Sequence, residues 1–308
     1  MKRLAIFAHY DRDGVIDEHV MYYLRGLQPV TERILFISDC DLKLGEAEKL
    51  TRVAELIWAG RHGEYDFGSW KRGFAHLGAG MEDWDEIVLA NDSCYAPVFP
   101  FADVFDRMGR SECDAWGCTS TSRKGKIHWL SSYFLVFRRP VLADQEFRAF
   151  WPAVIAELNS AAVAARYEID LSKLLIARGF RLESVVNTDV PSVPIQGCYV
   201  RYLLPAYRLP WLKVQLYRNN QLSVVRLGRT LGAIDNHYPR RLIDAHISRL
   251  LGTDSPRHYH YWLGSFHWPL GEWFPFRMMG HVKNNCWWKV YLRIFGVRVF
   301  GITIPLFR

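Results

Sequence analysis

The sequence lacks the features that place a chain in a membrane or in an oxidising compartment. No uninterrupted apolar run approaches the ~18–20 residues that a membrane-spanning helix needs. The apolar stretch near the start ends at His9, which makes it too short for the core of a secretory signal. The six cysteines form no CxxC pair, and buried reduced thiols are a commoner state of such residues than disulfides or zinc ligands. We therefore expect a cytoplasmic protein.

Several catalytic signatures are also missing. The sequence has no GxxxxGKS/T phosphate loop, no GxGxxG after its first apolar segment, no GxSxG nucleophile elbow and no HExxH zinc motif. The eleven histidines do not fall at metal-ligand spacings with acids or cysteines. The sequence therefore carries the signature motif of none of these enzyme classes.

The composition is that of a chain with a large core. Half of the 308 residues are hydrophobic and 15% are aromatic, so disorder is not expected. The formal net charge of +7 favours an anionic partner, such as a nucleotide phosphate or an anionic lipid. Seven cations but only one acid, Glu272, lie beyond residue 255, so the rest of the chain is nearly neutral. A nucleic-acid partner is not expected, because it would need a basic face on the main domain.

Predicted strands and helices alternate over the first ~180 residues, which favours an α/β fold with a mostly parallel sheet covered on both faces. Apolar runs predict strands at 4–8, 34–37, 56–59, 87–90, 115–119 and 133–137. Amphipathic or capped stretches predict helices at 17–26, 46–56, 67–77, 101–108, 147–158 and 168–178. We assign residues 1–190 to this Rossmann-like domain.

The chain changes character after residue 190, where prolines become frequent. A helix is predicted at 240–251, and loose alternation in the last twenty residues predicts a β-hairpin. We assign residues 191–308 to a small aromatic and basic extension. Its five tryptophans beyond residue 255 and its cations suit docking on the inner face of an anionic membrane. A packed aromatic subdomain with a solvated basic rim explains them equally well.

The first segment with chemical potential is Asn91-Asp92-Ser93, which directly follows a predicted buried strand. In open α/β sheets, ligands bind at the carboxyl ends of the strands. A carboxylate there can hold Mg²⁺ or Mn²⁺, hard cations that prefer oxygen ligands and stabilise charge on a leaving diphosphate. Taken alone, an ordinary Asx turn explains these three residues more simply.

The second segment runs from Arg61 to Lys71 and leads into a predicted helix. A helix N-terminus suits phosphate, and the two cations add charge. Asp66 can accept a hydrogen bond from a ribose hydroxyl or from the imide of a pyrimidine. The simpler interpretation makes Asp66 an N-cap and leaves the cations in solvent.

The third segment is Tyr167-Glu168-Ile169-Asp170, where two acids open an amphipathic helix. Such acids usually complement the helix dipole. In an enzyme, Glu168 or Asp170 would instead be a general base that deprotonates an acceptor hydroxyl. Weaker candidates are His9, Tyr10 and Asp11 for stacking on a base. His128 and Tyr133 could bind a sugar, and Lys213 could bind a phosphate.

Taken together and in order, these segments resemble the rhamnan synthesis protein F family of bacterial glycosyltransferases. The resemblance covers roughly residues 1–215. It rests on IFAHYD at 6–11 with Gly14, DFGSWK at 66–71, NDSCYAP at 91–97, DAWGCT at 114–119, SYFLVF at 132–137, Tyr167-Glu168 and LPWLK at 209–213. Several linked motifs in order are more specific than any one of them.

The resemblance implies a GT-A-like domain that binds a nucleotide-diphospho-sugar, with dTDP-L-rhamnose as the donor. The acceptor would be a glycan or lipid-linked glycan of cell-surface polysaccharide, such as O-antigen. Asn91-Asp92-Ser93 would replace the usual DxD signature, with Asp92 as the ligand of Mg²⁺ or Mn²⁺. Glu168, or else Asp170, would be the base in an inverting displacement.

The implied site has a donor part and a sugar part. The donor residues are His9, Tyr10, Asp11, Arg61, Asp66, Gly68, Trp70, Lys71, Asn91 and Ser93, and the acceptor or sugar residues are His128, Ser132, Tyr133 and Lys213. The chain departs from the pattern in two places: its signature holds one acid, and Ser131 stands where the family more often has Gln. A non-catalytic carbohydrate-binding or assembly protein of the same fold is therefore the alternative.

Overall fold

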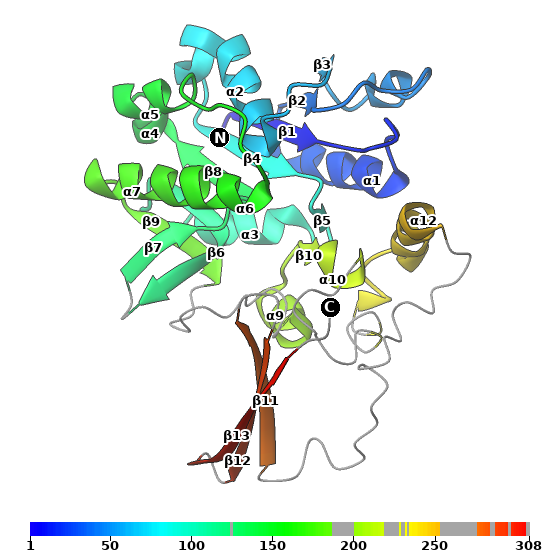
Figure 1. Ribbon diagram of the computed structural model, residues 1–308. Coiled ribbons are helices and arrows are strands. Elements are labelled where there is room, and N and C mark those ends of the chain that lie inside the picture. Colours follow the sequence, from blue (N-terminus) through cyan, green and yellow to red (C-terminus); the bar gives the residue numbers. More distant parts are fainter. Residues whose placement is uncertain are drawn as a thin grey trace.

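The protein is described by a computed structural model that covers residues 1–123, 126–186, 200–218 and 234–252, the isolated residues 228 and 232, and the backbone of strands at 276–283, 287–294 and 297–305. Its centre is an eight-stranded sheet with the order β3-β2-β1-β4-β8-β6-β7, in which β9 also pairs with β6 (Figure 1). The strands are β1 (Arg3–His9), β2 (Arg33–Ser38), β3 (Leu56–Ala59), β4 (Glu86–Asn91), β6 (Ala115–Arg123), β7 (Lys126–Leu130), β8 (Phe134–Arg138) and β9 (Leu182–Val186).

Most strands of this sheet run in one direction. The pairs β1–β2, β2–β3, β1–β4 and β6–β9 are parallel. Strand β8 is inserted antiparallel between β4 and β6, and β7 forms an antiparallel hairpin with β6. The predicted α/β architecture with a mostly parallel sheet is therefore confirmed, although β7 and β9 were not predicted.

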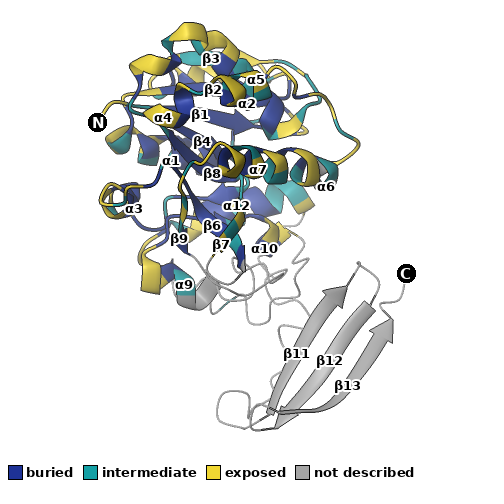
Figure 2. Cartoon of the chain, turned by 90° about the vertical axis from the view of Figure 1, so that its left-hand side faces the viewer, coloured by how far each residue is buried: buried dark blue, intermediate teal, exposed yellow. Residues whose placement is uncertain are grey.

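Helices cover both faces of the sheet because the strand side chains alternate between two cores. Leu4, Ile6 and Ala8 of β1 pack with α2 (Tyr65–Leu77), α5 (Gln145–Phe150) and α7 (Ile169–Ala177). Ala5 and Phe7 pack with α1 (Glu18–Leu27) and α3 (Phe101–Met108) on the other face. Figure 2 shows the buried strands between these half-exposed helices.

Two predicted helices are shorter than expected. The segment 46–56 forms only a 3₁₀ turn at Ala47–Leu50, since Leu50 and Ala54 are its only buried residues and give it no apolar stripe. The helix predicted at 147–158 ends at Phe150, because Pro152 has no N–H to continue it. The short helices α4 (Arg139–Leu142) and α6 (Ser160–Val163) flank this region.

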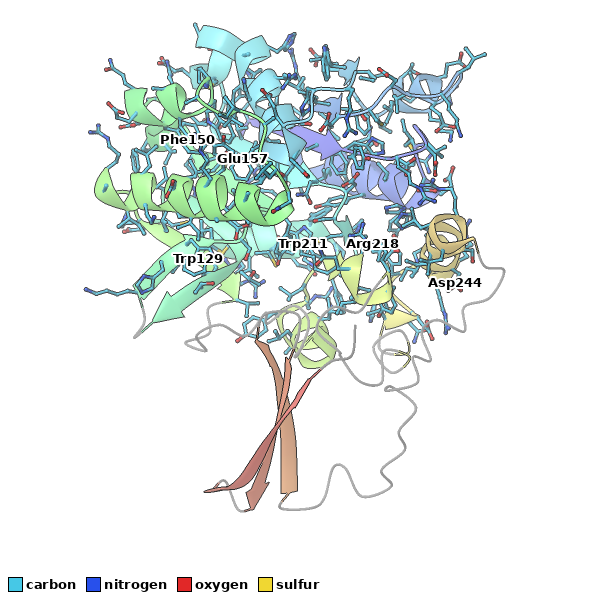
Figure 3. All side chains as sticks on the ribbon, in the orientation of Figure 1. Trp129, Phe150, Glu157, Trp211, Arg218 and Asp244 are labelled. Atoms are coloured by element: carbon cyan, nitrogen blue, oxygen red, sulfur yellow. The ribbon has the colours of Figure 1, made fainter. Side chains whose placement is uncertain are left out.

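Residues beyond 190 contribute to the same core. The described elements there are α9 (Val200–Tyr207), β10 (Leu212–Lys213), α10 (Gln215–Arg218) and α12 (Arg240–Leu251). Strand β10 pairs antiparallel with β5 (Cys94–Tyr95), and α12 packs on α1. Trp211 lies at this junction (Figure 3), where its Nε1 donates to the Tyr23 hydroxyl at 3.0 Å. The helix at 240–251 is confirmed, whereas the domain boundary at 190 stays a prediction.

The C-terminal strands form a separate antiparallel sheet, β11 (Phe276–Lys283), β12 (Trp287–Ile294) and β13 (Val297–Pro305). The β12–β13 pair confirms the predicted hairpin. The aromatic and basic side chains of this tail lie outside the described part of the chain, so both interpretations of them stay predictions. Within the described residues, no helix is long and apolar enough to cross a membrane.

Close packing of α2 on β1 depends on Gly73. A Cβ at this position would lie 2.5 Å from Ile6 Cγ2. We expect Gly73→Ala to lower the free energy of unfolding by about 1–2 kcal/mol, because overpacking outweighs the gain of ~1 kcal/mol in helix propensity. Urea unfolding followed by circular dichroism measures the change. Gly80→Ala is the control, since its Cβ would meet only Asp83 Oδ2 at 3.6 Å; equal losses in both variants would contradict the packing argument.

Candidate functional site

The polar segments that follow β1 and β4 meet at the carboxyl-terminal edge of the sheet. Strand β1 has β2 on one side and β4 on the other, so the chain changes its direction of progress across the sheet at this point. Such a switch point opens a crevice at the strand ends, where ligands bind. Here the Tyr10 N–H donates to Asp92 Oδ2 at 2.8 Å and joins the two segments.

A hydrogen-bonded chain runs across this edge from Asp66 to Lys213. Asn91 Nδ2 donates to Asp66 Oδ2 at 2.9 Å, and Asn91 Oδ1 accepts from Ser93 Oγ at 2.5 Å. Lys213 Nζ then donates to Ser93 Oγ at 3.1 Å. Lys213 reaches this position because β10 pairs with β5, directly after Ser93. The start of α2, the end of β4 and a C-terminal strand thus form one polar group.

Lys213 also contacts an aromatic ring. Its Nζ lies 3.9 Å from the ring centroid of Tyr133, which is buried. A cation over an aromatic face is attracted by the ring quadrupole, most strongly where water is excluded. The ammonium group is therefore held in place by Ser93 on one side and by Tyr133 on the other.

Glu168 joins the group from the helical side. It ends a π-helical turn, Ala164–Glu168, that leads into α7, and such turns occur often at functional sites. Its Oε2 accepts the N–H of Ser132 at 2.8 Å. Burial raises the pKa of Glu168, while hydrogen bonds from Ser132 and the charge of Lys213 oppose this rise. Glu168 is therefore closer than an ordinary carboxyl to accepting a proton near neutral pH.

Asp92 has the most altered carboxyl of the site. Burial, together with the negative charges of Asp66 and Asp11, raises the pKa of Asp92 to about 7 despite the hydrogen bond from the Tyr10 N–H. Burial also raises the pKa of Asp66. A carboxylate crowded by others is stabilised by a nearby cation. The oxygen donors present thus fit a hard divalent cation such as Mg²⁺ or Mn²⁺.

The loop after β1 combines hydrogen-bonded side chains, those of His9 and Asp11, with the exposed side chain of Tyr10. His9 Nδ1 is hydrogen-bonded to Ser38 Oγ at 2.8 Å, and burial lowers the pKa of His9 to about 4. Asp11 accepts from two backbone N–H groups of its own loop and from Arg249. The Tyr10 ring, in contrast, is 49% exposed and has the Arg61 guanidinium 5.1 Å from its centroid. This pair offers an open aromatic and cationic face beside Asp92.

Sequence reasoning missed two residues that organise this region. Asp39 follows β2, and its Oδ1 accepts the N–H groups of His62 and Gly63, both at 2.7 Å. Asp39 thereby fixes the loop that carries Arg61. Its position after a buried strand was the available signal. Arg249 lies on α12, and its contact with Asp11 is a tertiary contact that no local pattern indicates.

Several residues singled out in the sequence are not brought into this group. Lys71 Nζ donates to Glu64 at 3.1 Å and to the Val154 carbonyl at 2.7 Å. Trp70 is buried in the core with its Nε1 on the Ala90 carbonyl, and Gly68 packs against Glu64 inside α2. His128 is exposed on β7. Asp170 is exposed and pairs with Lys173 at 2.9 Å.

Comparison with known proteins adds the family. The profile described as rhamnan synthesis protein F matches residues 34–265. The chain belongs to the rhamnan synthesis protein F family. One curated relative of this family member is the uncharacterized protein y4gN of Sinorhizobium fredii (strain NBRC 101917 / NGR234), 26% identical over 204 residues, which are 66% of this chain and 53% of the relative. The chain thus spans about half the length of the curated relative it matches.

The solved structures that match the chain are distant in sequence. A putative glucose-1-phosphate thymidylyltransferase from Bacillus anthracis matches with a TM-score of 0.40 and 11% identity, over 60% of this chain and 87% of that one. A putative nucleotide-diphospho-sugar transferase from Desulfovibrio desulfuricans G20 matches with a TM-score of 0.38 and 15% identity, over 80% and 99%. Residues 1–349 of S. aureus TarS match with a TM-score of 0.35 and 11% identity, over 96% and 97%.

The raised pKa of Asp92 predicts a pH-dependent stability in this rhamnan synthesis protein F family member. Between the ordinary Asp value of ~3.9 and about 7, the folded state binds the Asp92 proton and the unfolded state does not. Stability contributed by this group therefore falls as pH rises through that range. We expect Asp92→Asn to raise the free energy of unfolding by about 1–3 kcal/mol at pH 8, allowing for partial solvent exposure, and by much less at pH 4.5.

Urea unfolding at both pH values, with EDTA present, measures this difference. Asp106→Asn, at an exposed carboxyl of α3, is the control and should change neither value by more than about 0.5 kcal/mol. An Asp92→Asn effect of the same size at pH 4.5 and pH 8 would show that ionisation of Asp92 does not cause it.

Proposed function

We propose that this chain is a sugar-nucleotide-dependent glycosyltransferase that extends a cell-surface polysaccharide or lipid-linked glycan, with dTDP-L-rhamnose as its donor. Family membership supports the polysaccharide context. The observation that carries the proposal is the single polar group at the β1–β4 strand ends, in which Asp66, Asp92, Glu168 and Lys213 meet. It combines groups for binding a nucleotide, neutralising a diphosphate and accepting a proton.

The donor would lie across the strand ends, with its nucleotide on the open side of the β1 loop. The Tyr10 ring and the Arg61 guanidinium suit stacking on a base, because both are planar groups on exposed side chains. Asp66 would accept from the ribose or from the base. Lys213, rather than Lys71, is the cation available for the diphosphate, since Lys71 is bonded to Glu64 and Val154.

Asp92 would hold Mg²⁺ or Mn²⁺ at this site. When bound, the cation would supply positive charge to the leaving diphosphate. Asn91 and Ser93 shape the same turn, because Asn91 Oδ1 accepts from both the N–H and the hydroxyl of Ser93. This Asx turn directs the Asp92 carboxylate and the Ser93 hydroxyl to one edge. The two interpretations of Asn91-Asp92-Ser93, structural turn and ligand site, are therefore compatible.

Glu168 would take the proton of the acceptor hydroxyl. The hydroxyl oxygen then attacks the anomeric carbon as the bond from that carbon to the diphosphate oxygen breaks. Direct displacement inverts the configuration, so a β-linked donor gives an α-linked product. Asp170 is the less suitable base, because it is exposed and paired with Lys173.

Two matched carboxyl variants test the base. We expect Glu168→Gln to lower kcat by about 10²–10⁴-fold, since the amide cannot accept the acceptor proton. Asp170→Asn, two residues later in α7 and exposed, should keep kcat within a few-fold of the parent. The assay follows dTDP release from dTDP-L-rhamnose with a lipid-linked glycan fraction as acceptor. Near-parental turnover of folded Glu168→Gln would remove Glu168 from the mechanism.

Nucleotide binding tests the function without an acceptor. We expect isothermal titration calorimetry to detect binding of one of the nucleotides dTDP, UDP and GDP, with dTDP the expected ligand. We expect the affinity for that nucleotide to depend on Mn²⁺. Asp92→Ala should lose the Mn²⁺-dependent part of the binding free energy. If the folded protein binds none of the three nucleotides with or without Mn²⁺, a non-catalytic carbohydrate-binding or assembly role becomes the better explanation.

A further inference from the structure

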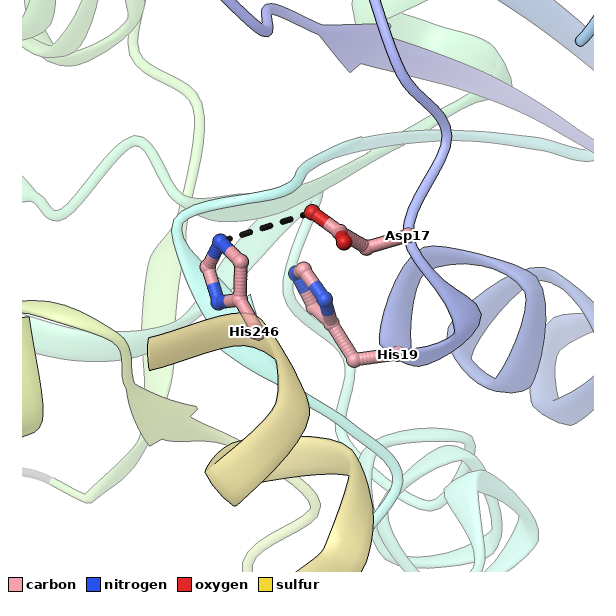
Figure 4. A group of neighbouring side chains, drawn as sticks. All are labelled: Asp17, His19 and His246. Atoms are coloured by element: carbon pink, nitrogen blue, oxygen red, sulfur yellow. Dashed lines mark ion pairs between the residues drawn. The ribbon is translucent and has the colours of Figure 1, made fainter. Parts of the chain in front are cut away.

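A second group of polar side chains lies where α12 packs on the start of α1 (Figure 4). Asp17 precedes α1, His19 is in its first turn, and His246 comes from α12. One nitrogen or oxygen atom of each lies within 4.8 Å of those of the other two. His246 Nε2 is 3.7 Å from Asp17 Oδ2, and the two imidazole rings stack with centroids 4.1 Å apart. The proposed transferase chemistry uses none of these three residues.

Both imidazoles are buried where α12 packs on α1, with 3% of His19 and 8% of His246 exposed. His19 Nδ1 is buried and has no hydrogen-bond partner among the described residues. A buried polar atom without a partner costs about 1–3 kcal/mol. A bound cation would satisfy such a nitrogen.

The surroundings orient the other two groups. The Tyr95 hydroxyl is hydrogen-bonded to His246 Nδ1 at 2.9 Å. If Nδ1–H donates to Tyr95, the lone pair is on Nε2, the nitrogen that faces Asp17. Arg249 donates to both oxygens of Asp17, from Nε at 2.9 Å and from Nη2 at 2.5 Å. Contacts of this kind fix the ring orientation and the carboxylate of metal ligands in proteins.

The charges around this group nearly cancel. Arg249 contacts three carboxylates, those of Asp11, Asp13 and Asp17, and Arg12 also pairs with Asp13 at 3.2 Å. A cation would therefore be held here by its ligand atoms and not by a surplus of negative charge.

We propose that Asp17, His19 and His246 bind one transition-metal ion, with Zn²⁺ as the preferred ion. Two imidazole nitrogens and a carboxylate oxygen are a usual ligand set for Zn²⁺, with water as the fourth ligand. Zinc–ligand bonds of ~2.0–2.1 Å place tetrahedral ligand atoms about 3.4 Å apart. Binding therefore draws the three groups inward by about 1 Å, and one ring turns out of the stack so that both lone pairs face the ion.

The ion would join the C-terminal helix α12 to the loop that follows β1. This loop carries Asp11 and Tyr10, and Arg249, one turn after His246, already binds Asp11. Zinc at this position stabilises the packing of α12 and thereby the site edge formed by Tyr10 and Asp92. The inference does not depend on the proposed transferase activity, since its ligands and its test are separate.

Zn²⁺ and Co²⁺ titrations of the EDTA-treated chain of 308 residues test the proposal. We expect one equivalent of Zn²⁺ to bind and to raise the Tm, and Co²⁺ to give the visible ligand-field bands of a tetrahedral N/O site. Tyr95→Phe should weaken Zn²⁺ binding by about 10–100-fold, because it removes the hydrogen bond that orients His246. His19→Ala and His246→Ala should abolish binding, whereas His128→Ala, at an exposed histidine of β7, should leave it unchanged.

Asp92→Ala separates this site from the proposed donor site, and it should leave Zn²⁺ binding intact. The proposal is overturned if folded wild-type protein shows neither a Zn²⁺-dependent rise in Tm nor Co²⁺ bands. It is also overturned if His19→Ala binds Zn²⁺ as tightly as the wild type. The wild-type spectra decide the question even where His246→Ala fails to fold.

Discussion

The parallel pairing of β1 with β4 determines where the other parts of the candidate site lie. In its register Ala8 lies opposite Asn91, so the two chains leave the sheet together and their next residues are neighbours. The Tyr10 N–H lies beyond the hydrogen-bonded residues of the β1–β4 pair and donates to the Asp92 carboxylate. Because both strands are buried, a slip by one residue would turn their apolar side chains to the wrong core. The hydrophobic pattern of two strands thus fixes the position of a carboxylate.

The site is completed by residues far along the chain. Lys213 stands next to Ser93 because β10 adds an antiparallel pair to β5, and Trp211 anchors that strand against Phe134 and the Tyr23 hydroxyl. The charge of Lys213 opposes the rise that burial causes in the pKa of both Asp66 and Glu168. The negative charge of Asp66 acts in the opposite direction on Glu168. The segment after residue 200 is therefore part of the electrostatics of the site.

Local sequence patterns were sufficient to predict the bounds of helices and strands whose ends coincide with a clear change in residue type. The strand at 56–59 and the helices at 101–108 and 240–251 were predicted to the residue. The position of Asn91-Asp92-Ser93 at a strand end was also predictable, because an apolar run reveals its own end. Residues inside a helix were harder to place, since each step turns the side chain by about 100°. Trp70 therefore faces the sheet, although it stands close to the polar start of α2.

Contacts between distant segments were beyond local patterns. Arg249 meets Asp11, and His246 meets Asp17 and Tyr95, only because α12 packs on α1. The histidines of this group show no metal-ligand spacing in the sequence, since His19 and His246 are far apart along the chain. The pairing of Asp11 with Arg249 also matters for Asp92. The negative charges of Asp66 and Asp11 both raise the pKa of Asp92, and Arg249 offsets the charge of Asp11. Asp66 is therefore the charge with the larger effect on Asp92. With that pKa at about 7, a proton and a divalent cation would compete for the same carboxylate near neutral pH. A diphosphate adds negative charge, so on the proposed function the donor and a cation should enter this site together.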